Sequence, residues 1–204
     1  MTVDSRDEHR DGLKFNVSNH SRITSEANSG ILTSEQLALV IANNVAQDGH
    51  QVDSKRHFDN CCFAEGAAYI KDEWHKIEVE TDPLTETALI AFGRLLHTVQ
   101  DFYAHSNWIE LHQSDDPIPI WDLDLNTLPS GIVSGTWSIG YPKNCTSQAP
   151  HHSQLNKDNP ESEEGRKVVA IGPNHGKTLF TLAYDAAIRA SSKQFEQLKN
   201  VNKK

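Results

Sequence analysis

The sequence has 204 residues, which suits one folded domain because a single hydrophobic core usually serves about 100–200 residues. Hydrophobic residues make up 37% and charged residues 23%, so the chain has a globular composition rather than a disordered or fibrous one. The formal net charge of −9 argues against a generic nucleic-acid-binding protein, which needs a positive field. No stretch approaches the ~20 apolar residues of a membrane span, and the beginning of the sequence is polar. We therefore expect a chain that is cytoplasmic as synthesised, unless it is exported without a leader.

The helical patterns begin clearly at residue 33, because the first 30 residues are polar and predict at most a short helix. Residues 33–49 carry apolar side chains at helical spacing behind Thr33 or Ser34 as the cap. A second helix is expected over residues 61–80. It ends before Pro83, because proline cannot continue the helical hydrogen bonds.

Residues 84–106 give the strongest helical pattern, with apolar residues on most sides, and predict a central, buried helix. Residues 111–173 then hold seven of the eight prolines, so long irregular loops are expected there. A last helix is expected over residues 175–199. These patterns predict one all-α domain over residues 1–204, a helical bundle with a loop-rich region between its central and last helices.

Cysteine and histidine carry the remaining compositional information. Three cysteines cannot form a full set of disulfides, and Cys61 and Cys62 are adjacent, so we expect packed thiols. Histidine occupies 11 of 204 positions, and imidazole is the commonest metal ligand in proteins. The positions of the histidines are therefore the main functional signal in the sequence.

The central helix carries a polar seam formed by His97, Asp101 and His105 at four-residue intervals. Each interval advances ~6 Å along a helix and only ~40° around it, so the three side chains share one face. Burying three ionisable groups without partners costs several kcal/mol (on the order of 2–7 for each polar group), and a divalent cation would satisfy them. The alternative is a His–Asp–His hydrogen-bond network that only ties helices together.

One helix cannot enclose an ion, so further ligands must come from other segments. His57 and Asp59 lie in the stretch RHFDN just before the second helix, and other candidates are His20, His152 and His175. Taken alone, His20, His152 and His175 are weak signals, whereas the loop position of His57 and Asp59 leaves their side chains free to converge. They gain weight because several segments would then direct a histidine to one interior site.

The block HTVQDFYAHSNW, with the flanking stretches HFDN, HSRIT and HHSQLNKDNP, resembles the heterokaryon-incompatibility C (Het-C) family over residues 18–190. That family is distantly similar to zinc-dependent phospholipase C and to fungal zinc nucleases, which are all-helical and hold three zinc ions. The resemblance implies that His97 binds one zinc ion and that Asp101 bridges two. It further implies that His20 is an early ligand and that Asp59 is a ligand that also orients or deprotonates the attacking water. It makes Asp59 and Asp101 the expected catalytic residues, with one to three zinc ions as cofactors.

The function implied by this resemblance is a zinc-binding cell-death or cytotoxic effector that acts at membranes. Its metal site would hydrolyse phosphodiesters of phospholipids, because two zinc ions activate water and stabilise charge on phosphate oxygens. The alternatives are a membrane-permeabilising protein with structural metal ions, a nuclease-like phosphodiesterase, and an inert helical binding module. We expect membrane phospholipid as the partner and a neighbouring regulatory protein as a second one, rather than nucleic acid.

Overall fold

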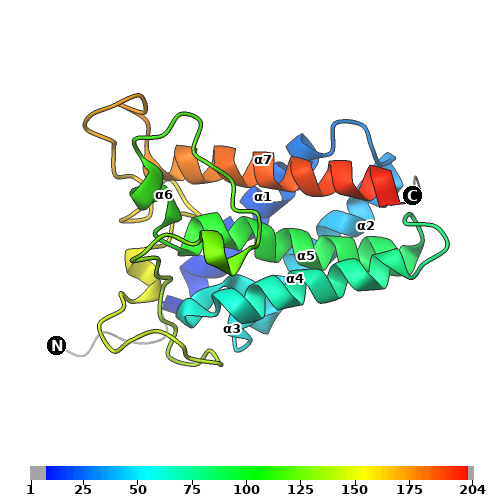
Figure 1. Cartoon of the computed structure of the whole chain (residues 1–204), viewed down its shortest axis with the longest axis horizontal. Helices are drawn as coiled ribbons and strands as arrows, with labels where there is room; N and C mark the ends of the chain where they lie inside the picture. The colour runs from blue at the N-terminus through cyan, green and yellow to red at the C-terminus, as the bar shows by residue number, and fades with distance from the viewer. Residues whose placement is uncertain (1–7, 202–204) are drawn as a thin grey trace.

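The computed structural model describes residues 8–201, and these form helices and loops without a β-strand (Figure 1). This confirms the predicted all-α class. The α-helices of the described chain are α1 (Glu8–Ala27), α2 (Ser34–Val45), α3 (Ser54–His57), α4 (Phe63–Glu78), α5 (Glu86–His105), α6 (Trp108–His112) and α7 (Leu179–Asn200).

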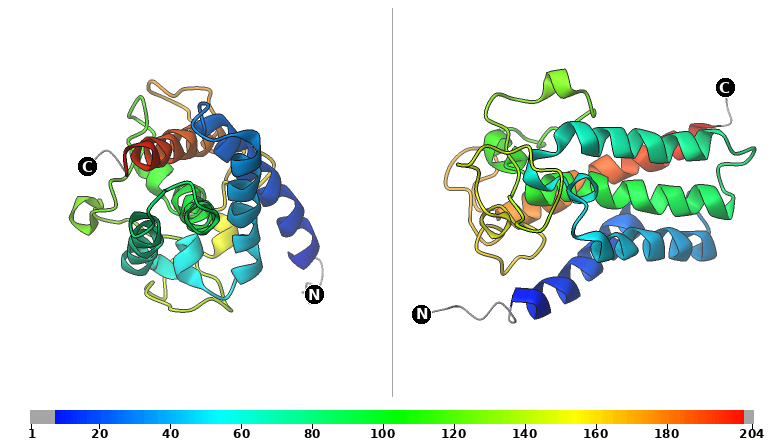
Figure 2. Two further views of the ribbon diagram at one scale, coloured as in Figure 1. Left: turned by 90° about the vertical axis from the view of Figure 1, so that its right-hand side faces the viewer. Right: turned by 90° about the horizontal axis from the view of Figure 1, so that it is seen from below.

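Helix α5 is the central helix, as its apolar pattern predicted. It packs against α2, α4 and α7, and Figure 2 shows these helices arranged around it. Almost every α5 residue after Glu86 is buried, so this helix forms the core of the bundle. Helix α2 comes especially close at Gly93, where an added Cβ would lie 2.4 Å from the carbonyl oxygen of Val40.

Helix α1 is the main departure from the elements expected from the sequence. The sequence predicted at most a short helix before residue 30, whereas α1 spans Glu8–Ala27. Its described end packs against α2 and α7 and buries Ile23 and Ala27 in the core. Tertiary packing of this kind contributes more helix stability than local propensity does, which is why the polar local sequence under-predicted it.

The last helix begins at Leu179 rather than at residue 175. The preceding residues form a short hairpin in which Val169 and Lys177 share a backbone hydrogen bond of 2.9 Å. Gly172 and Gly176 adopt positive φ angles of 87° and 84° in its turn, a conformation that interrupts a helix. Thr178 then caps α7 by accepting a hydrogen bond from the Thr181 backbone.

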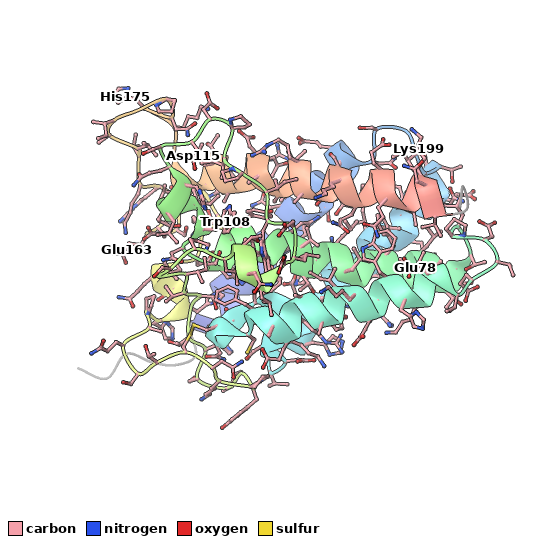
Figure 3. All side chains as sticks on the ribbon, viewed as in Figure 1. Glu78, Trp108, Asp115, Glu163, His175 and Lys199 are labelled. Carbon is pink, nitrogen blue, oxygen red and sulfur yellow. A yellow bond between two sulfur atoms is a disulfide. The ribbon has the colours of Figure 1, made fainter. Side chains whose placement is uncertain are left out.

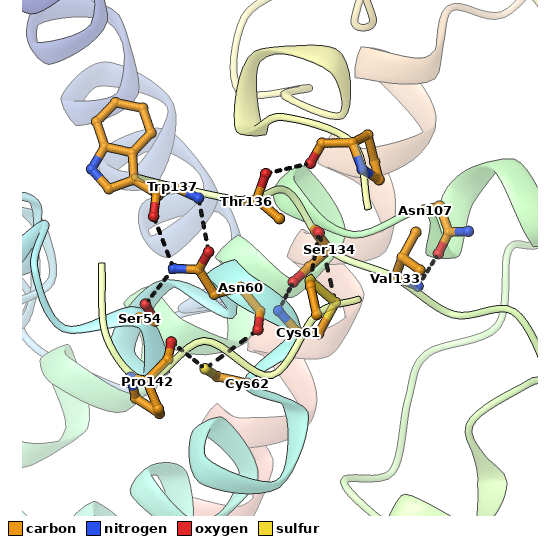
Figure 4. Close-up of a disulfide and its surroundings, with 12 residues drawn as sticks. Ser54, Asn60, Cys61, Cys62, Asn107, Val133, Ser134, Thr136, Trp137 and Pro142 are labelled. Carbon is orange, nitrogen blue, oxygen red and sulfur yellow. Dashed lines mark hydrogen bonds between the residues drawn. A yellow bond between two sulfur atoms is a disulfide. The ribbon is translucent and has the colours of Figure 1, made fainter. Parts of the chain in front are cut away.

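The long loops between α6 and α7 cover one end of the bundle (Figure 1). They are fastened there by a disulfide between Cys61 and Cys145, 84 residues apart in the sequence (Figure 4). The expectation of three thiols was therefore wrong for this pair, because folding brings Cys145 to a partner that is remote along the chain. Cys62 is a buried thiol, and burial raises its pKa to about 12.

Asn60 organises the same loop around the turn that follows α3. Its side-chain amide donates to Ser54 Oγ at 2.8 Å, and its Oδ1 accepts from the Trp137 backbone at 2.9 Å (Figure 4). Asn60 and Phe58 adopt left-handed φ angles of 55° and 53°, so the chain reverses sharply on both sides of Asp59. None of the described helices combines the length and apolar character needed to cross a membrane.

Candidate metal centre

The polar seam on α5 lies inside the bundle, and its three side chains share a face as their spacing predicted. His97, Asp101 and His105 are buried, with exposed fractions of 0%, 1% and 5%. His97 Nε2 lies 3.0 Å from Asp101 Oδ2, and His105 Nδ1 lies 4.0 Å from the same oxygen. Asp101 is therefore flanked by an imidazole one helical turn away on each side.

Two histidines from other helices approach the same carboxylate. His20 of α1 places Nε2 3.1 Å from Asp101 Oδ1, and His57 of α3 places Nδ1 2.9 Å from Asp101 Oδ2. His57 Nδ1 is also 3.1 Å from His97 Nε2. Two ligand atoms on one tetrahedral zinc ion lie about 3.4 Å apart, since Zn–N and Zn–O distances are about 2.0–2.2 Å. The spacing of these donor atoms is therefore close to that of a coordination shell.

Buried amides hold the outer nitrogens of two of these histidines. His20 Nδ1 donates to Gln100 Oε1 at 2.6 Å, and His97 Nδ1 donates to Asn44 Oδ1 at 3.3 Å. The amides are themselves oriented, because Gln100 Nε2 donates to the Thr24 hydroxyl at 3.0 Å. An imidazole whose Nδ1 carries the proton presents the Nε2 lone pair, and Nε2 is the atom that faces Asp101 in both cases.

A second group of candidate ligands lies toward the loop-covered end of the bundle. Asp59, from the turn after α3, places Oδ1 2.8 Å from His152 Nδ1 and 3.8 Å from His105 Nδ1. Asp158 accepts a hydrogen bond from the other ring nitrogen of His105, Nε2, at 2.9 Å. A carboxylate behind a histidine is the usual outer partner of a metal-bound imidazole, since it fixes the ring orientation and tautomer.

Three sets of side chains have ligand atoms that all lie within 4.8 Å of one another, which is close enough to hold an ion. They are His20, His97 and Asp101; Asp59, His105 and His152; and Asp101, His105 and Asp158. The last two sets share His105, whose Nε2 faces Asp158 and whose Nδ1 lies 3.1 Å from the His57 carbonyl oxygen and 3.8 Å from Asp59. The arrangement is thus suited to two ions, with Asp101 between them.

The electrostatics of the centre are those of a tightly packed set of carboxylates and imidazoles. Burial lowers the pKa of His20, but the charge of Asp101 together with other carboxylates raises it to about 9. Burial lowers the pKa of His97 to about 3, so this ring is neutral near pH 7. Burial raises the pKa of Asp101, but the surrounding imidazoles outweigh it and hold that pKa well below its usual range. The centre therefore favours a carboxylate anion with cationic or metal-binding partners.

The structure brings together every predicted ligand except His175. The residues that converge are His20, His57, Asp59, His97, Asp101, His105 and His152. His175 is exposed on the turn before α7, at the outer edge of the molecule (Figure 3), and belongs to none of the described metal-binding sets. It was expected at a helix start, but it lies between two turn glycines that direct the chain away from the centre.

Sequence reasoning missed two carboxylates of the centre. Asp158 is the outer partner of His105, and Asp48 Oδ1 lies 3.9 Å from His97 Nε2. Burial raises the pKa of Asp48 to about 6. Neither residue stands at a recognisable ligand spacing, so no sequence signal marked them. Asp158 lies in the stretch HHSQLNKDNP, which was noted for its histidines alone.

Comparisons with known proteins identify a different family from the one that the sequence motifs suggested. The family model of the VWA7 N-terminal domain matches residues 16–121, just over half of the chain. Human von Willebrand factor A domain-containing protein 7 is 36% identical over 83 residues, which is 38% of this chain and 9% of that protein. This chain therefore corresponds to a small part of the length of that relative. No solved structure matches this chain.

These matches overturn the resemblance to Het-C proteins. The expected cell-death effector, the phospholipase C-like or nuclease-like hydrolysis and the membrane permeabilisation depended on that resemblance and are corrected with it. The family assignment was wrong because it relied on short histidine and aspartate motifs. Unrelated families can share the same arrangement of metal-binding side chains. The matched segment contains α2 to α6 and most of the candidate ligands, and this chain belongs to the VWA7 N-terminal domain family.

Proposed function

We propose that this chain is a zinc-binding domain whose buried centre holds two ions. The first ion is bound by His20, His97 and Asp101, with His57 beside them. The second is bound by Asp59, His105 and His152, with Asp158 behind His105 as its outer partner.

One observation carries this proposal. Asp101 Oδ1 is buried without a hydrogen-bond partner, although His20 Nε2 lies only 3.1 Å away. His20 Nδ1 donates its proton to Gln100, and with a pKa raised to about 9 the ring also holds a proton on Nε2 near pH 7, so a positive charge faces this carboxylate oxygen in the metal-free chain. The space between Nε2 and this oxygen thus favours a positive charge, and a zinc ion there would take the place of the Nε2 proton.

The mixture of donors favours zinc over the hard cations. The two sets assigned to the two ions each combine two imidazole nitrogens with one carboxylate, which suits a tetrahedral zinc ion. Calcium and magnesium prefer shells made of oxygen atoms. Zinc bound here would join α1, α5, the turn after α3 and the loop of residue 152, which are far apart in the sequence. Binding would therefore stabilise the folded state, because the unfolded chain has no such site.

The disulfide bears on where this domain works. The Cys61–Cys145 bond supports an oxidising compartment for the folded chain rather than the cytoplasm, because the cytosol keeps thiols reduced.

The test is the zinc content of the purified chain, measured by mass spectrometry of the metal after dialysis against buffered zinc. We expect two zinc ions per chain, one fewer in His152→Ala and one fewer in His20→Ala. His151→Ala is the matched control, since His151 is exposed, and it keeps both ions. A wild-type chain that retains no zinc, and whose melting temperature does not respond to a chelator, would favour the hydrogen-bond network instead.

A further inference from the structure

A cleft of about 700 Å³ is lined by residues of α2, α3, α4 and α5 and of the turn Ala46–His50. Helices α2, α3 and α4 lie around α5 in this part of the bundle (Figure 2). Among the described residues that line it there is no candidate metal ligand, so the cleft is separate from the metal centre. We call it the basic cleft, because four cationic side chains line it: Lys55, Arg56, Lys76 and Arg94.

The charge of the basic cleft is opposite to that of the chain. The full sequence has 19 Lys and Arg against 28 Asp and Glu, whereas the lining has four cations against two carboxylates, Asp72 and Glu73. Glu73 is buried and lies 2.6 Å from Lys76 Nζ, so its charge is already compensated. The cleft therefore attracts anions locally, although the molecule as a whole repels them.

Arg56 is held in a fixed orientation beside the cleft. Its Nε donates to Asp53 Oδ2 at 2.9 Å, and its Nη1 donates to Gln47 Oε1 at 2.7 Å. Its guanidinium carbon lies 5.3 Å from the centre of the Tyr69 ring, and both Gln47 and Tyr69 are buried. Within the described chain, Nη2 makes no hydrogen bond. A guanidinium oriented in this way loses little conformational freedom when it binds an anion.

Arg94 is the cation of the cleft without a counter-charge. It is half-buried on α5, and within the described chain its guanidinium has no carboxylate at ion-pairing distance. Partial burial lowers the pKa of His50, which also lines the cleft, and the charges of Arg56 and Arg94 lower it further. Both arginines thus contribute to one positive field. A half-buried cation in this position is stabilised by an anion that enters the cleft.

We propose that the basic cleft binds a small phosphate ester, with Arg94 and the Nη2 of Arg56 as the contacts of the phosphate group. A phosphate monoester carries a charge of about −1.5 to −2 near pH 7, which matches the excess of two cations over carboxylates in the lining. A single carboxylate would compensate only half of that excess. The volume lies in the range of about 300–1,000 Å³ that is usual for small-molecule sites, so it leaves room for the organic part of an ester. This inference does not depend on zinc binding.

The test is calorimetric titration of the full chain with phenyl phosphate, benzoate and inorganic phosphate. We expect phenyl phosphate to bind saturably, and the other two to bind more weakly, because benzoate has one charge and inorganic phosphate leaves most of the cleft empty. Arg94→Gln weakens the binding of phenyl phosphate by about tenfold or more, since a hydrogen bond to a charged group contributes about 1.5–3 kcal/mol.

Two further variants test the sign of the charge effect. Asp72→Asn removes an exposed carboxylate from the lining and strengthens the binding of phenyl phosphate by about two- to fivefold. Arg166→Gln is the matched control for Arg94→Gln, because it removes the same charge from an exposed position outside the cleft. That variant keeps the wild-type affinity. Asp72→Asn decides the question even if Arg94→Gln does not fold, since Asp72 is exposed.

The outcomes also separate the cleft from the metal centre. Benzoate that binds as tightly as phenyl phosphate would overturn the preference for phosphate, and equal binding of inorganic phosphate would overturn the ester. An affinity that neither Arg94→Gln nor Asp72→Asn changes would overturn the cleft as the site. Binding that a chelator abolishes, and that Arg94→Gln leaves intact, would assign the phosphate to the metal centre instead.

Discussion

Replacing Gln100 tests whether the buried amides orient the metal-binding histidines. Gln100 Oε1 accepts hydrogen bonds from His20 Nδ1 at 2.6 Å and from Asn44 Nδ2 at 3.2 Å. Leucine at this position removes the acceptor that fixes the His20 tautomer. Losing an outer partner of a metal ligand typically lowers metal affinity by about 10–100-fold, which corresponds to about 1.4–2.8 kcal/mol. We expect a loss of this size at the first ion and little change at the second.

Two further variants isolate this effect. Gln100→Glu keeps an acceptor for His20 and supplies a carboxylate, so we expect zinc affinity equal to or above that of the wild type. Gln194→Leu is the matched control, because Gln194 is a buried glutamine on α7 that accepts a hydrogen bond from the Trp74 indole. We expect Gln194→Leu to lower the free energy of unfolding and to leave the zinc affinity unchanged.

The assay is competition for zinc with a chromophoric chelator, combined with urea unfolding of the metal-free proteins. The urea measurement is needed because Gln100→Leu leaves the buried His20 N–H without an acceptor, which lowers the free energy of unfolding by about 1–3 kcal/mol even without zinc. If Gln100→Leu binds zinc as tightly as Gln194→Leu does, the amide has no orienting role and the reasoning is refuted.

Three other predictions follow from the packing and the charges. Gly93→Ala lowers the free energy of unfolding in urea by about 1–3 kcal/mol, because its Cβ meets the Val40 carbonyl. Gly49→Ala is the control, because there is open space around its added Cβ, and an equal loss of unfolding free energy in both variants would contradict this account. Zinc affinity measured by calorimetry rises with pH up to about pH 9, because below its raised pKa of about 9 the His20 imidazole holds a proton that zinc must displace. The expected slope is about tenfold per pH unit for each displaced proton, and a flat profile would argue against His20 as a ligand. Cys61→Ser frees the loop that carries His152 and lowers stability by up to about 4 kcal/mol, and zinc analysis should then show the second ion lost before the first. Simultaneous loss of both ions would show that the disulfide supports the whole centre.

Helix α5 shows how much of the site local sequence could predict. The 3.6-residue period alone places His97, Asp101 and His105 on one face, since these positions depend only on the geometry of one helix. The same period identified α5 as the central helix, because its apolar residues occupy most of its circumference. Family assignment from the same motif was wrong. A spacing of histidines and aspartates indicates metal-binding chemistry, but it does not identify the family to which a chain belongs.

The partners of that helix were decided by the tertiary structure. His175 and Asp158 are both polar residues of the loops between α6 and α7, and nothing local distinguishes the exposed histidine from the buried aspartate. The same holds for Cys145, whose disulfide partner lies 84 residues earlier.

The sequence by itself thus determined the all-α class, the central helix and the spacing of its polar seam, which are consequences of short-range periodicity. Only the tertiary structure decided that α1 folds onto α2 and α7, and that Asp59 and His152 meet over His105. These are contacts between segments remote along the chain. Their formation depends on how whole faces pack and on where turns direct the backbone, which no local pattern encodes.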